Sequence, residues 1–478
     1  METKHKVLIM RCANYDAEKI AGIVKEGMEE LGVKPTGKIL LKPNVVLAHP
    51  EVFPNAFTRK EFLDGVISAT KKSAHNVKEI AVGERSGITI PTRFNFKNAG
   101  YNEIIKKHKV KAYYFDEVVQ VPVKLTKAGR LRDQIFIPRP IVETDFLINL
   151  PKFKAHPWCR LTLSLKNFIG IQDDRHRLVD HNLFLEQKIA DLQEVIQPHF
   201  IAIDAIEAGQ KMMLTPTPFA MGAIVMGTNS CAVDTVGCHM VNVAPKDLIH
   251  LRLAAERGFG PMALNEIEVA GDFPLGEMQE KTKNFEFVLE HINKYFKDLN
   301  LKCTVGSFPV QHSADYCWGG CPGALQEAMH IFKGYYPNVY QDMKKIHYVV
   351  GEVNGPLEVA ADERVIFTGD CTSWAGTIDG RPVKIESSYR SPHEVDEKLT
   401  KSNDMLKKTV FSLLNLFRKR KAKYLHLKGC PVSVGDHVHY ISSLGKIGNP
   451  NFDRRMVVSV NLAYLRMRVQ RFINRLLG

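Results

Sequence analysis

The stretch from residue 142 to residue 171 gathers side chains that could bind and transform an anion. Within sixteen positions it carries basic, hydroxyl, imidazole and amide groups, namely Lys152, Lys154, His156, Arg160, Thr162, Lys166 and Asn167. Apolar residues are threaded through the same run: Phe153, Trp158, Leu161 and Leu165. A solvated basic loop needs no such apolar content, and a core element tolerates cations only where negative groups meet them. We therefore predict a lined pocket for an anionic ligand, with a surface loop of amphipathic lysines as the alternative.

The candidate catalytic groups are His156, Lys166 and Lys42. A histidine carries protons near neutral pH, and a lysine crowded by like charges has a lowered pKa suited to base or imine chemistry. The candidate substrate-binding residues are polar and charged, and most of them follow predicted strands: Asn44, Arg59, Glu84, Lys152, Lys154, Asn167, Asp204 and Asp234. The three carboxylates of this set could also hold a divalent cation or orient the cations opposite them.

Two common nucleotide-binding patterns are absent from the chain. No Gly-x-Gly-x-x-Gly pattern follows the first predicted strand, and no Gly-Lys-Ser/Thr loop occurs, so neither fingerprint is indicated. Cys159 lies three residues after His156, which suggests a metal pair or a nucleophile with its base. A small buried hydrophobe is the more common role for such a cysteine, and we expect that role here.

Four cysteines of the C-terminal half stand in loop-type, glycine-flanked contexts: Cys317, Cys321, Cys371 and Cys430. The first two share a glycine-rich turn, and the other two each end a predicted strand, so a parallel arrangement would bring those two to one sheet edge. Four thiolates are the usual ligand set of a [4Fe–4S] cluster, and we predict one such cluster here. A structural zinc site would use the same thiolates, and scattered reduced thiols are the remaining alternative. Cys303 lies in a strand-like run and is left out.

Several separated motifs occur in an order that resembles a known family. These are Lys42-Pro43-Asn44, Thr58-Arg59, Leu150-Pro151-Lys152 with His156, and Lys166-Asn167. Over roughly residues 5–265 the chain resembles the family called domain of unknown function 362. The resemblance implies a family often found with iron–sulfur centres, and it implies no known reaction. The same stretch is faintly similar to the nickel-pincer lactate racemases, in which a strand, a histidine and a lysine near a glycine-bounded segment carry the cofactor.

Strands and helices are expected to alternate through the N-terminal half. Apolar runs predict strands at 6–10, 38–41, 77–83, 144–150, 200–203 and 222–227. Helical periodicity predicts helices at 16–31, 58–73 and 186–195, and one more carrying Asp234. This alternation favours an α/β fold with a mostly parallel sheet and helices on both faces. Ligands of such sheets bind outside the carboxyl ends of the strands, so we expect the polar residues there to converge. The alternative is that loops are polar anyway.

A change in composition after the N-terminal half predicts a second, smaller α/β domain that bears the cysteines. Its expected elements are a helix from Pro322, strands at 346–350, 364–368 and 424–427, and a long helix after Pro392. The expected domain boundaries are 1–275 for the α/β domain with the anion pocket, 276–305 for a connection, 306–450 for the iron–sulfur domain and 451–478 for a basic amphipathic helix. The connection is expected to contain an amphipathic helix at about 284–297.

Length and composition are those of a globular protein. With 478 residues the chain is long enough for two or three domains. It is 45% hydrophobic and 24% charged, which is ordinary. No window reaches the length of a membrane-spanning apolar run, and the N-terminus has no signal-peptide core, so a cytoplasmic location is expected. Nine cysteines, an odd number in a long cytosolic chain, favour metal or redox use by some of them over a disulfide framework.

The net charge of +13 is concentrated near the C-terminus. Residues 405–423 carry seven Lys and Arg, residues 454–478 carry six Arg, and neither segment contains an acidic residue. The rest of the chain is near neutral, so nucleic-acid binding is not expected. The helix at 451–478 has a regular apolar face, which would pack on its own domain, join a partner helix or lie on an anionic membrane surface.

Taken together, these patterns favour an iron–sulfur protein, either an oxidoreductase or an electron-transfer component, that acts on a small anionic substrate. One alternative is a racemase- or isomerase-like enzyme in which His156 and Lys166 carry proton transfer or a lysine-attached cofactor. Another is a non-enzymatic metal- or ligand-binding scaffold that assembles with a redox partner protein through its basic tail.

Overall fold

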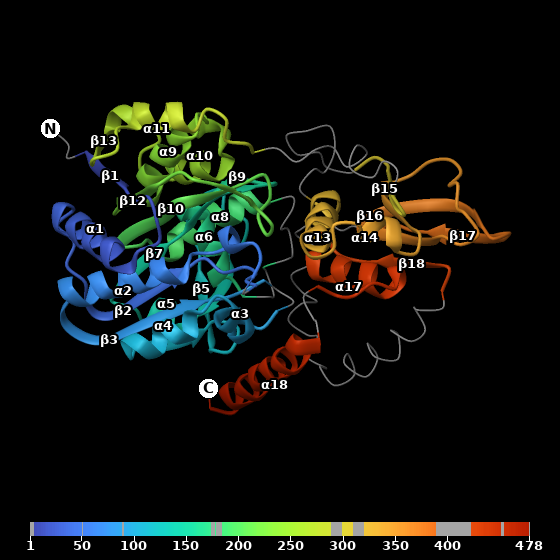
Figure 1. Cartoon of the computed structure of the whole chain (residues 1–478), viewed down its shortest axis with the longest axis horizontal. Helices are drawn as coiled ribbons and strands as arrows, with labels where there is room; N and C mark the ends of the chain where they lie inside the picture. Colours follow the sequence, from blue (N-terminus) through green and yellow to red (C-terminus); the bar gives the residue numbers. More distant parts are fainter. Residues whose placement is uncertain are drawn as a thin grey trace. The chain divides into compact units, whose positions relative to one another are not determined.

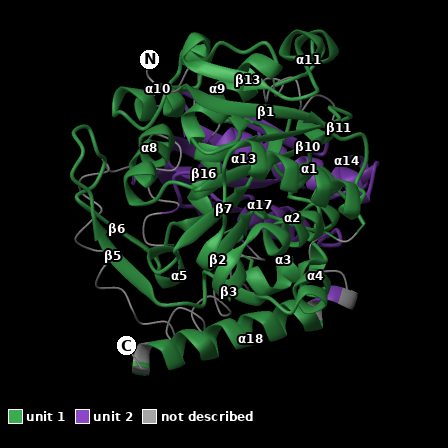
Figure 2. Ribbon diagram, turned by 90° about the vertical axis from the view of Figure 1, so that its left-hand side faces the viewer, with its two compact units in different colours: residues 1–176, 184–288, 458–478 green, residues 177–183, 289–457 purple. Residues whose placement is uncertain are grey.

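The structure is a computed structural model that describes residues 4–49, 51–87, 90–173, 177, 184–287, 299–308, 320–388, 422–450 and 454–477. The chain divides into two compact units (Figures 1 and 2). Unit 1 contains Met1–His176, Phe184–Val288 and Val458–Gly478, and unit 2 contains Arg177–Leu183 and Leu289–Val457. The last segment of the chain therefore belongs to the same unit as the first.

An eleven-stranded sheet lies at the centre of the described part of unit 1. Its main path is β13 (Ile267–Ala270), β1 (His5–Arg11), β12 (Ala223–Gly227), β10 (Phe200–Gln210), β7 (Phe146–Leu150), β2 (Thr36–Pro43), β3 (His75–Glu84) and β4 (Lys111–Tyr114). Beside it lie β8 (Lys152–His156), β9 (Arg160–Thr162) and β11 (Thr217–Phe219). Along the main path only β12 runs antiparallel to its neighbours. The expected α/β fold with a mostly parallel sheet is confirmed.

Successive residues of the central strands enter two separate apolar cores, one on each face of the sheet, because strand side chains alternate between faces. In β1, Val7 and Ile9 join one core, whereas Leu8 and Met10 join the other. The first core takes residues from α8 (Leu185–Val195), α9 (Ser230–Met240), α10 (Ile249–Glu256) and α11 (Leu275–Lys281). The second takes residues from α1 (Ala17–Glu30), α2 (Lys60–Ser73), α3 (Thr92–Asn98) and α4 (Tyr101–His108). The helices predicted at 16–31, 58–73 and 186–195 and the helix carrying Asp234 are confirmed as α1, α2, α8 and α9.

Helix α1 forms for reasons that are visible in its sequence. The carboxylate of Asp16 accepts hydrogen bonds from the first backbone N–H groups of the helix, at 3.0 and 3.2 Å, and so caps donors that would otherwise lack partners. Ile20, Val24 and Met28 recur at a spacing of four and are buried on the sheet. The helix thus packs on one face of the sheet whose strands carry candidate site residues.

The stretch after β7 is a hairpin followed by a short helix, because β8 pairs antiparallel with β9 and the chain then enters α6 (Ser164–Asn167). Lys152, Lys154 and His156 alternate with Phe153 and Ala155 along β8, and all five residues are buried. Burial rules out a surface loop of amphipathic lysines for these positions. The cations are instead part of the folded interior.

The remaining described elements of unit 1 are short. They are η1 (Pro54–Ala56), β5 (Gln120–Lys124), β6 (Gln134–Pro138), α5 (Arg139–Val142), η2 (Phe168–Ile171), η3 (Pro245–Asp247) and η4 (Leu264–Glu266). Strands β5 and β6 pair antiparallel in a separate hairpin. No strand or helix was predicted between residues 84 and 144, and the structure places α3, α4, α5, β4, β5 and β6 there.

Unit 2 is a smaller α/β unit with a five-stranded sheet in its described residues. The strands are β14 (Leu301–Val305), β15 (Ile346–Glu352), β16 (Arg364–Ile378), β17 (Arg381–Ile385) and β18 (Tyr424–Leu427), and the helices are α13 (Cys321–Tyr335), α14 (Val339–Asp342) and α17 (Val434–Gly445). All neighbouring strands pair in parallel except β17, which folds back on β16.

The connection expected at 276–305 contains a strand, and two expected helices lie mostly or wholly outside the described residues. Strand β14 lies inside 276–305, the segment expected to be only a connection, and it pairs with β15. Most of the helix expected at 284–297, and the long helix expected after Pro392, lie outside the described residues, and 284–287 are not helical.

Helix α18 (Arg454–Leu477) closes the chain, and from Val458 onwards it belongs to unit 1 (Figure 2). Arg471 Nε donates to the carbonyl of Asp116 at 2.5 Å, and the amide of Asn474 donates to the carbonyl of Glu117. The helix therefore packs on its own unit along one face. Among the described residues, neither α18 nor any other helix combines the length and apolar character of a membrane-spanning segment.

Candidate functional sites

Lys42 and Glu84 form a buried ion pair at the carboxyl ends of the neighbouring parallel strands β2 and β3. Lys42 Nζ lies 2.6 Å from Glu84 Oε2, and the side chains are 0% and 2% exposed. The other oxygen of Glu84 accepts the backbone N–H of Arg85 at 2.7 Å. Gly170 passes so close that a Cβ there would stand 2.0 Å from Glu84 Oε1, so only glycine lets η2 cover this pair. The charge of Lys42 is matched inside the fold.

A chain of amide side chains links three elements near this pair. Asn44 Nδ2 donates to Asn167 Oδ1 at 3.1 Å, and Asn167 Nδ2 donates to Asn149 Oδ1 at 2.8 Å. Asn149 Nδ2 in turn donates to Ser164 Oγ at 2.9 Å, which lies 2.9 Å from Ser230 Oγ. Buried amides in a connected chain fix one another's orientation. The predicted residues Asn44 and Asn167 are thus in direct contact. Asn149, Ser164 and Ser230, which were not predicted as site residues, extend the chain.

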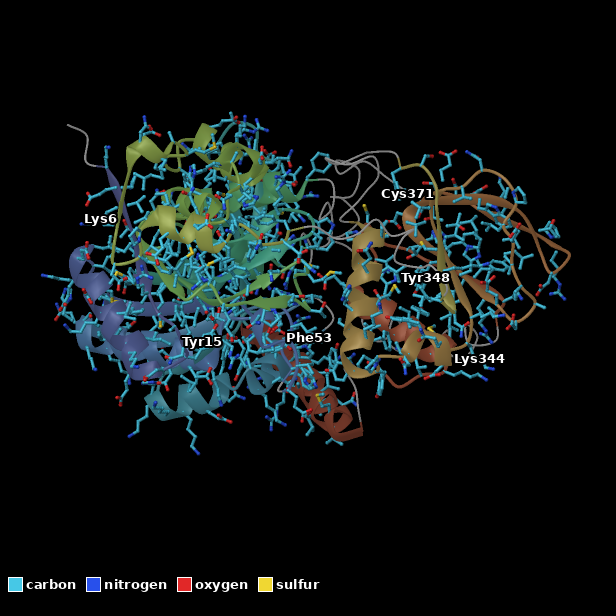
Figure 3. All side chains as sticks on the ribbon, turned by 45° about the horizontal axis from the view of Figure 1, so that its top comes forward. Lys6, Tyr15, Phe53, Lys344, Tyr348 and Cys371 are labelled. Carbon is cyan, nitrogen blue, oxygen red and sulfur yellow. The ribbon has the colours of Figure 1, made fainter. Side chains whose placement is uncertain are left out.

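A second buried ion pair joins Lys152 to Asp204, with Nζ and Oδ2 3.0 Å apart and both side chains 0% exposed. Tyr15 completes it: its hydroxyl donates to Asp204 Oδ1 at 2.8 Å and accepts from Lys152 at 2.7 Å (Tyr15 is labelled in Figure 3). Burial lowers the pKa of Lys152 from its ordinary value, and the Asp204 carboxylate opposes that shift. Burial first, and then the Asp204 charge, raise the pKa of Tyr15 well above its ordinary value.

Arg59 lies beside this cluster and is the most exposed of the candidate cations. Its backbone N–H donates to Asp204 Oδ2 at 3.1 Å, and its guanidinium carbon lies 4.8 Å from the centre of the Tyr15 ring. Its side chain is 26% exposed, and Glu207 lies 3.9 Å away. Of the cations joined to this cluster, Arg59 is the one that solvent can reach.

Lys154 is held by backbone carbonyls. Its Nζ donates to the carbonyls of Ala56 at 2.5 Å and Met213 at 2.9 Å, and the residue is 1% exposed. These bonds join β8 to η1 and to the segment after β10. In this arrangement the ammonium group ties three parts of unit 1 together.

His156 and Lys166 occupy a third region, at the end of β8 and in α6. The His156 Nδ1 atom accepts the backbone N–H groups of Trp158 at 3.2 Å and Cys159 at 3.3 Å, so Nε2 carries the proton of the neutral ring. Lys166 is 8% exposed. Burial, and secondly the charge of Lys166, lower the pKa of His250 to about 3. Lys166 also counteracts the burial that raises the pKa of the Cys159 thiol, so it lies among these groups. Cys159 is a buried thiol, as expected.

Asp234 holds the beginning of α6. Its two carboxylate oxygens accept the backbone N–H groups of Ser164 at 2.7 Å and Leu165 at 3.0 Å. The residue is completely buried, and this burial raises the pKa of its carboxyl to about 7, against the lowering effect of the two N–H groups. Asp234 therefore positions the helix that carries Lys166 and Asn167.

The raised pKa of Asp234 predicts how its replacement changes stability with pH. The unfolded carboxyl ionises near pH 4, whereas the folded one keeps its proton up to about pH 7, so the wild type loses stability as pH rises between these values. Asp234→Asn cannot titrate, but it loses one N–H acceptor. We expect the variant to be less stable than the wild type at pH 4. The difference between their free energies of unfolding should then narrow by a few kcal/mol by pH 8. Thermal unfolding of both proteins from pH 4 to pH 8 measures this, and a constant gap would contradict it.

In unit 2, the segments that carry three of the four predicted metal ligands meet at one place, which we call the thiol junction (residues 369–371, 429–432 and Cys321). The N–H of Asp370 donates to the carbonyl of Gly429 at 3.1 Å, and the N–H of Gly429 donates back to Asp370 Oδ1 at 2.9 Å. The N–H of Val432 donates to Cys321 Sγ at 3.4 Å. The ends of the paired parts of β16 and β18 and the beginning of α13 are therefore joined (Cys371 is labelled in Figure 3).

Gly369 forms a cradle between two of the sulfur atoms. Its φ of +103° favours glycine, and a Cβ there would stand 3.1 Å from Cys321 Sγ and 3.8 Å from Cys371 Sγ. Cys430 follows Gly429 directly, and the described cysteines outside the junction are free thiols, namely Cys12, Cys159, Cys231, Cys238 and Cys303. Among the described residues no three His, Cys, Asp or Glu side chains already form a metal-ligand set, and Cys317 lies outside those residues. The donor chemistry and the glycine cradle fit a sulfur-ligated centre.

The expected convergence at strand ends is thus seen as three groups of contacts: Lys42 with Glu84, Lys152 with Asp204, and Asn44 with Asn167. The first and third are joined, because Asn167 Nδ2 donates to the Lys42 carbonyl at 3.4 Å. Asp204 lies within β10, because that strand continues to Gln210. Tyr15, which lies 189 residues from Asp204, and Asn149, which lies within the strand predicted at 144–150, were not predicted as site residues. Asn149 could have been found from the sequence, because it is a hydrogen-bonding side chain near the end of the apolar run that forms β7.

Comparison with known proteins places the N-terminal half in context. Residues 39–239 match the family model described as domain of unknown function (DUF362), which confirms the resemblance noted in the sequence. A thylakoid-associated protein of Synechocystis sp. is 21% identical over 279 residues, covering 54% of this chain and 81% of the relative.

Two solved structures are also similar. The lactate racemase apoprotein from Thermoanaerobacterium thermosaccharolyticum has a TM-score of 0.30 at 11% identity, covering 74% of this chain and 70% of that one. A Thermotoga maritima protein solved by a structural genomics consortium has a TM-score of 0.34 at 11% identity, covering 71% and 72%.

Proposed function

We propose that this chain is an iron–sulfur protein, an oxidoreductase or electron-transfer component that acts on a small anionic substrate. In the proposal, unit 2 holds one [4Fe–4S] cluster through Cys317, Cys321, Cys371 and Cys430. The observation that carries it is the thiol junction, where three cysteine-bearing segments far apart in sequence are tied by hydrogen bonds around Gly369.

The fourth ligand is within reach of the junction. Cys317 precedes Cys321 by four residues, so its Cα can lie at most about 14 Å from that of Cys321. The backbone N–H that points at Cys321 Sγ is of the kind that tunes the potential of cluster sulfurs. A zinc ion would accept the same thiolates, but the long intervals between these cysteines are unlike those of zinc ribbons.

When bound, such a cluster supplies one-electron transfer. The residues of unit 1 would supply the rest: Lys166 a positive charge for the substrate, and the His156 ring a proton held at Nε2. Arg59 is the solvent-reachable cation beside the second ion pair. Lys42 and Lys152 would act by holding the strand ends in place, because their charges are matched by Glu84 and Asp204. The free thiols of Cys12, Cys159, Cys231, Cys238 and Cys303 support a reducing compartment, so we also propose a cytoplasmic location.

Anaerobic purification of the full chain tests the cluster. We expect visible absorption that dithionite bleaches, with about four iron and four sulfide per chain, as the cluster formula requires. If the purified chain contains stoichiometric zinc and no sulfide, the four cysteines form a structural zinc site and not a cluster. Absence of both metals from protein made with added iron and sulfide would overturn the proposal.

The anionic substrate is tested separately at His156 and Lys166. Inorganic phosphate and acetate serve as probes of phosphate and carboxylate chemistry, and we expect each probe that binds to raise the thermal midpoint of the wild type. His156→Ala and Lys166→Ala are expected to abolish that rise while the circular dichroism spectrum stays unchanged. Arg160→Ala is the matched control. Arg160 was among the basic residues of the predicted pocket, but the structure shows its side chain exposed and paired with Asp247, unlike the buried His156 and Lys166. Variants that bind the probes as the wild type does would show that these residues are structural.

A further inference from the structure

Helix α18 exposes a continuous apolar stripe. Six large apolar side chains recur at intervals of four and three residues, namely Val458, Leu462, Leu465, Val469, Phe472 and Leu476. Their exposed fractions run from 49% to 70%. Residues at this spacing lie on one face of a helix, so the six form one surface, which we call the α18 stripe. Single exposed apolar residues are ordinary, but a contiguous row of six marks an interaction surface.

The stripe is not the face by which the helix packs on unit 1. Val460 and Ala463, on the opposite side of the helix, are 4% and 6% exposed. Arg471 and Asn474 make the hydrogen bonds to the carbonyls of Asp116 and Glu117. These contacts fix the rotation of the helix about its axis, so the stripe points away from unit 1.

Arginines border the stripe. At about 100° per residue, Arg466 lies on one side of the line through Leu465 and Arg468 lies on the other. Both arginines are exposed. Residues 454–478 contain six arginines and no acidic residue. The surface is therefore an apolar strip with positive borders.

The positive borders indicate which kind of partner binds the α18 stripe. A second copy of α18 would bring a like-charged border against each arginine border, with no carboxylate on the helix to answer it, and like charges in register oppose pairing. An anionic lipid surface answers both features, because acyl chains accept the stripe and headgroup phosphates accept the arginines. We propose that α18 docks the protein on an anionic membrane surface, lying in the plane of the interface with its stripe toward the acyl chains.

Flotation of the full-length protein with vesicles tests this proposal. Vesicles of phosphatidylcholine with about 30% phosphatidylglycerol are compared with phosphatidylcholine alone. We expect the wild type to float with the anionic vesicles at least tenfold more than with the neutral ones, and the bound fraction to fall as salt rises from about 0.1 to 0.5 M.

The stripe variant is Leu465→Glu with Phe472→Glu. Its matched control is Val77→Glu with Val142→Glu, which adds the same charge at exposed apolar positions of unit 1 outside α18. We expect the stripe variant to lose flotation and the control to keep it, with unchanged circular dichroism for both. Arg466→Gln with Arg468→Gln should weaken flotation several-fold and flatten its salt dependence.

Three outcomes would overturn membrane docking. The first is that the stripe variant floats as the wild type does, which would show that vesicle binding depends on surface charge and not on the apolar stripe. The second is that the wild type does not float, and that light scattering shows a dimer which the stripe variant lacks; the stripe would then join two copies. The third is a wild type that neither floats nor dimerises.

Discussion

Replacing Cys371 or Cys430 by alanine is expected to remove most of the bound iron from anaerobically prepared protein. Each substitution takes away one of four proposed thiolate ligands, and a cluster held by three thiolates and solvent is labile. The measurement is iron and sulfide per chain, together with the visible absorption that dithionite bleaches. Cys321→Ala should behave in the same way, because its sulfur lies at the Gly369 cradle.

The controls are three buried cysteines of unit 1, namely Cys12, Cys231 and Cys238. Burial raises the pKa of each of these thiols, which makes them poor metal ligands. Their alanine variants should keep the iron of the wild type. Full iron in both Cys371→Ala and Cys430→Ala would sink the assignment of the cluster.

Lys152→Met is expected to destabilise unit 1 by about 3–5 kcal/mol, because it leaves the Asp204 carboxylate buried without its counter-ion. Tyr15 would still donate to Asp204, but a hydroxyl does not replace a full charge. Hydrogen exchange of β10 peptides in increasing urea measures the loss, since those peptides report on unit 1 apart from unit 2.

The matched control for this prediction is Lys211→Met. Lys211 lies 2.8 Å from Glu286, and the two side chains are 42% and 58% exposed. An exposed pair of this kind contributes at most about 1 kcal/mol. The double variant Lys152→Met with Asp204→Leu removes both charges and should recover part of the loss. Equal losses for Lys152→Met and Lys211→Met would show that burial does not govern the first pair.

The sequence predicted the sheet well because its central strands are buried on both faces and read as unbroken apolar runs, as Leu147 and Ile148 do in β7. It also indicated that negative groups must meet the buried cations, because a cation cannot enter a core alone. An anionic ligand was expected in that role, whereas the structure pairs Lys42 with Glu84 and Lys152 with Asp204. Which carboxylate meets which lysine depends on strand order. Lys152 meets Asp204 because β8 pairs with β10 in that register, and no local pattern contains that information.

Two signals in the sequence were open to a different interpretation. Lysine, phenylalanine, lysine, alanine and histidine alternate from Lys152 to His156 with the period of two that indicates a strand, although lysine is rare inside sheets. The elements between 84 and 144 are short, and their polar content hid the helix pattern of residues 101–108. In both places the composition of the segment outweighed its periodicity, and the structure shows that periodicity was the better guide.

The return of the chain to unit 1 at Val458 has a consequence for synthesis on the ribosome. Most of unit 2, Leu289–Val457, lies between the two parts of unit 1 that end at Val288 and begin at Val458. About 170 residues therefore separate the sheet of unit 1 from the helix that donates to Asp116 and Glu117. At about 5–20 residues per second, the sheet emerges roughly 10–30 s before α18. Throughout that interval the nascent sheet must stand without Arg471 and Asn474, while unit 2 can complete its own strands. In a stalled chain that ends at Val457, a protease is therefore expected to cleave unit 1 near Asp116 before it cleaves within the strands of unit 2.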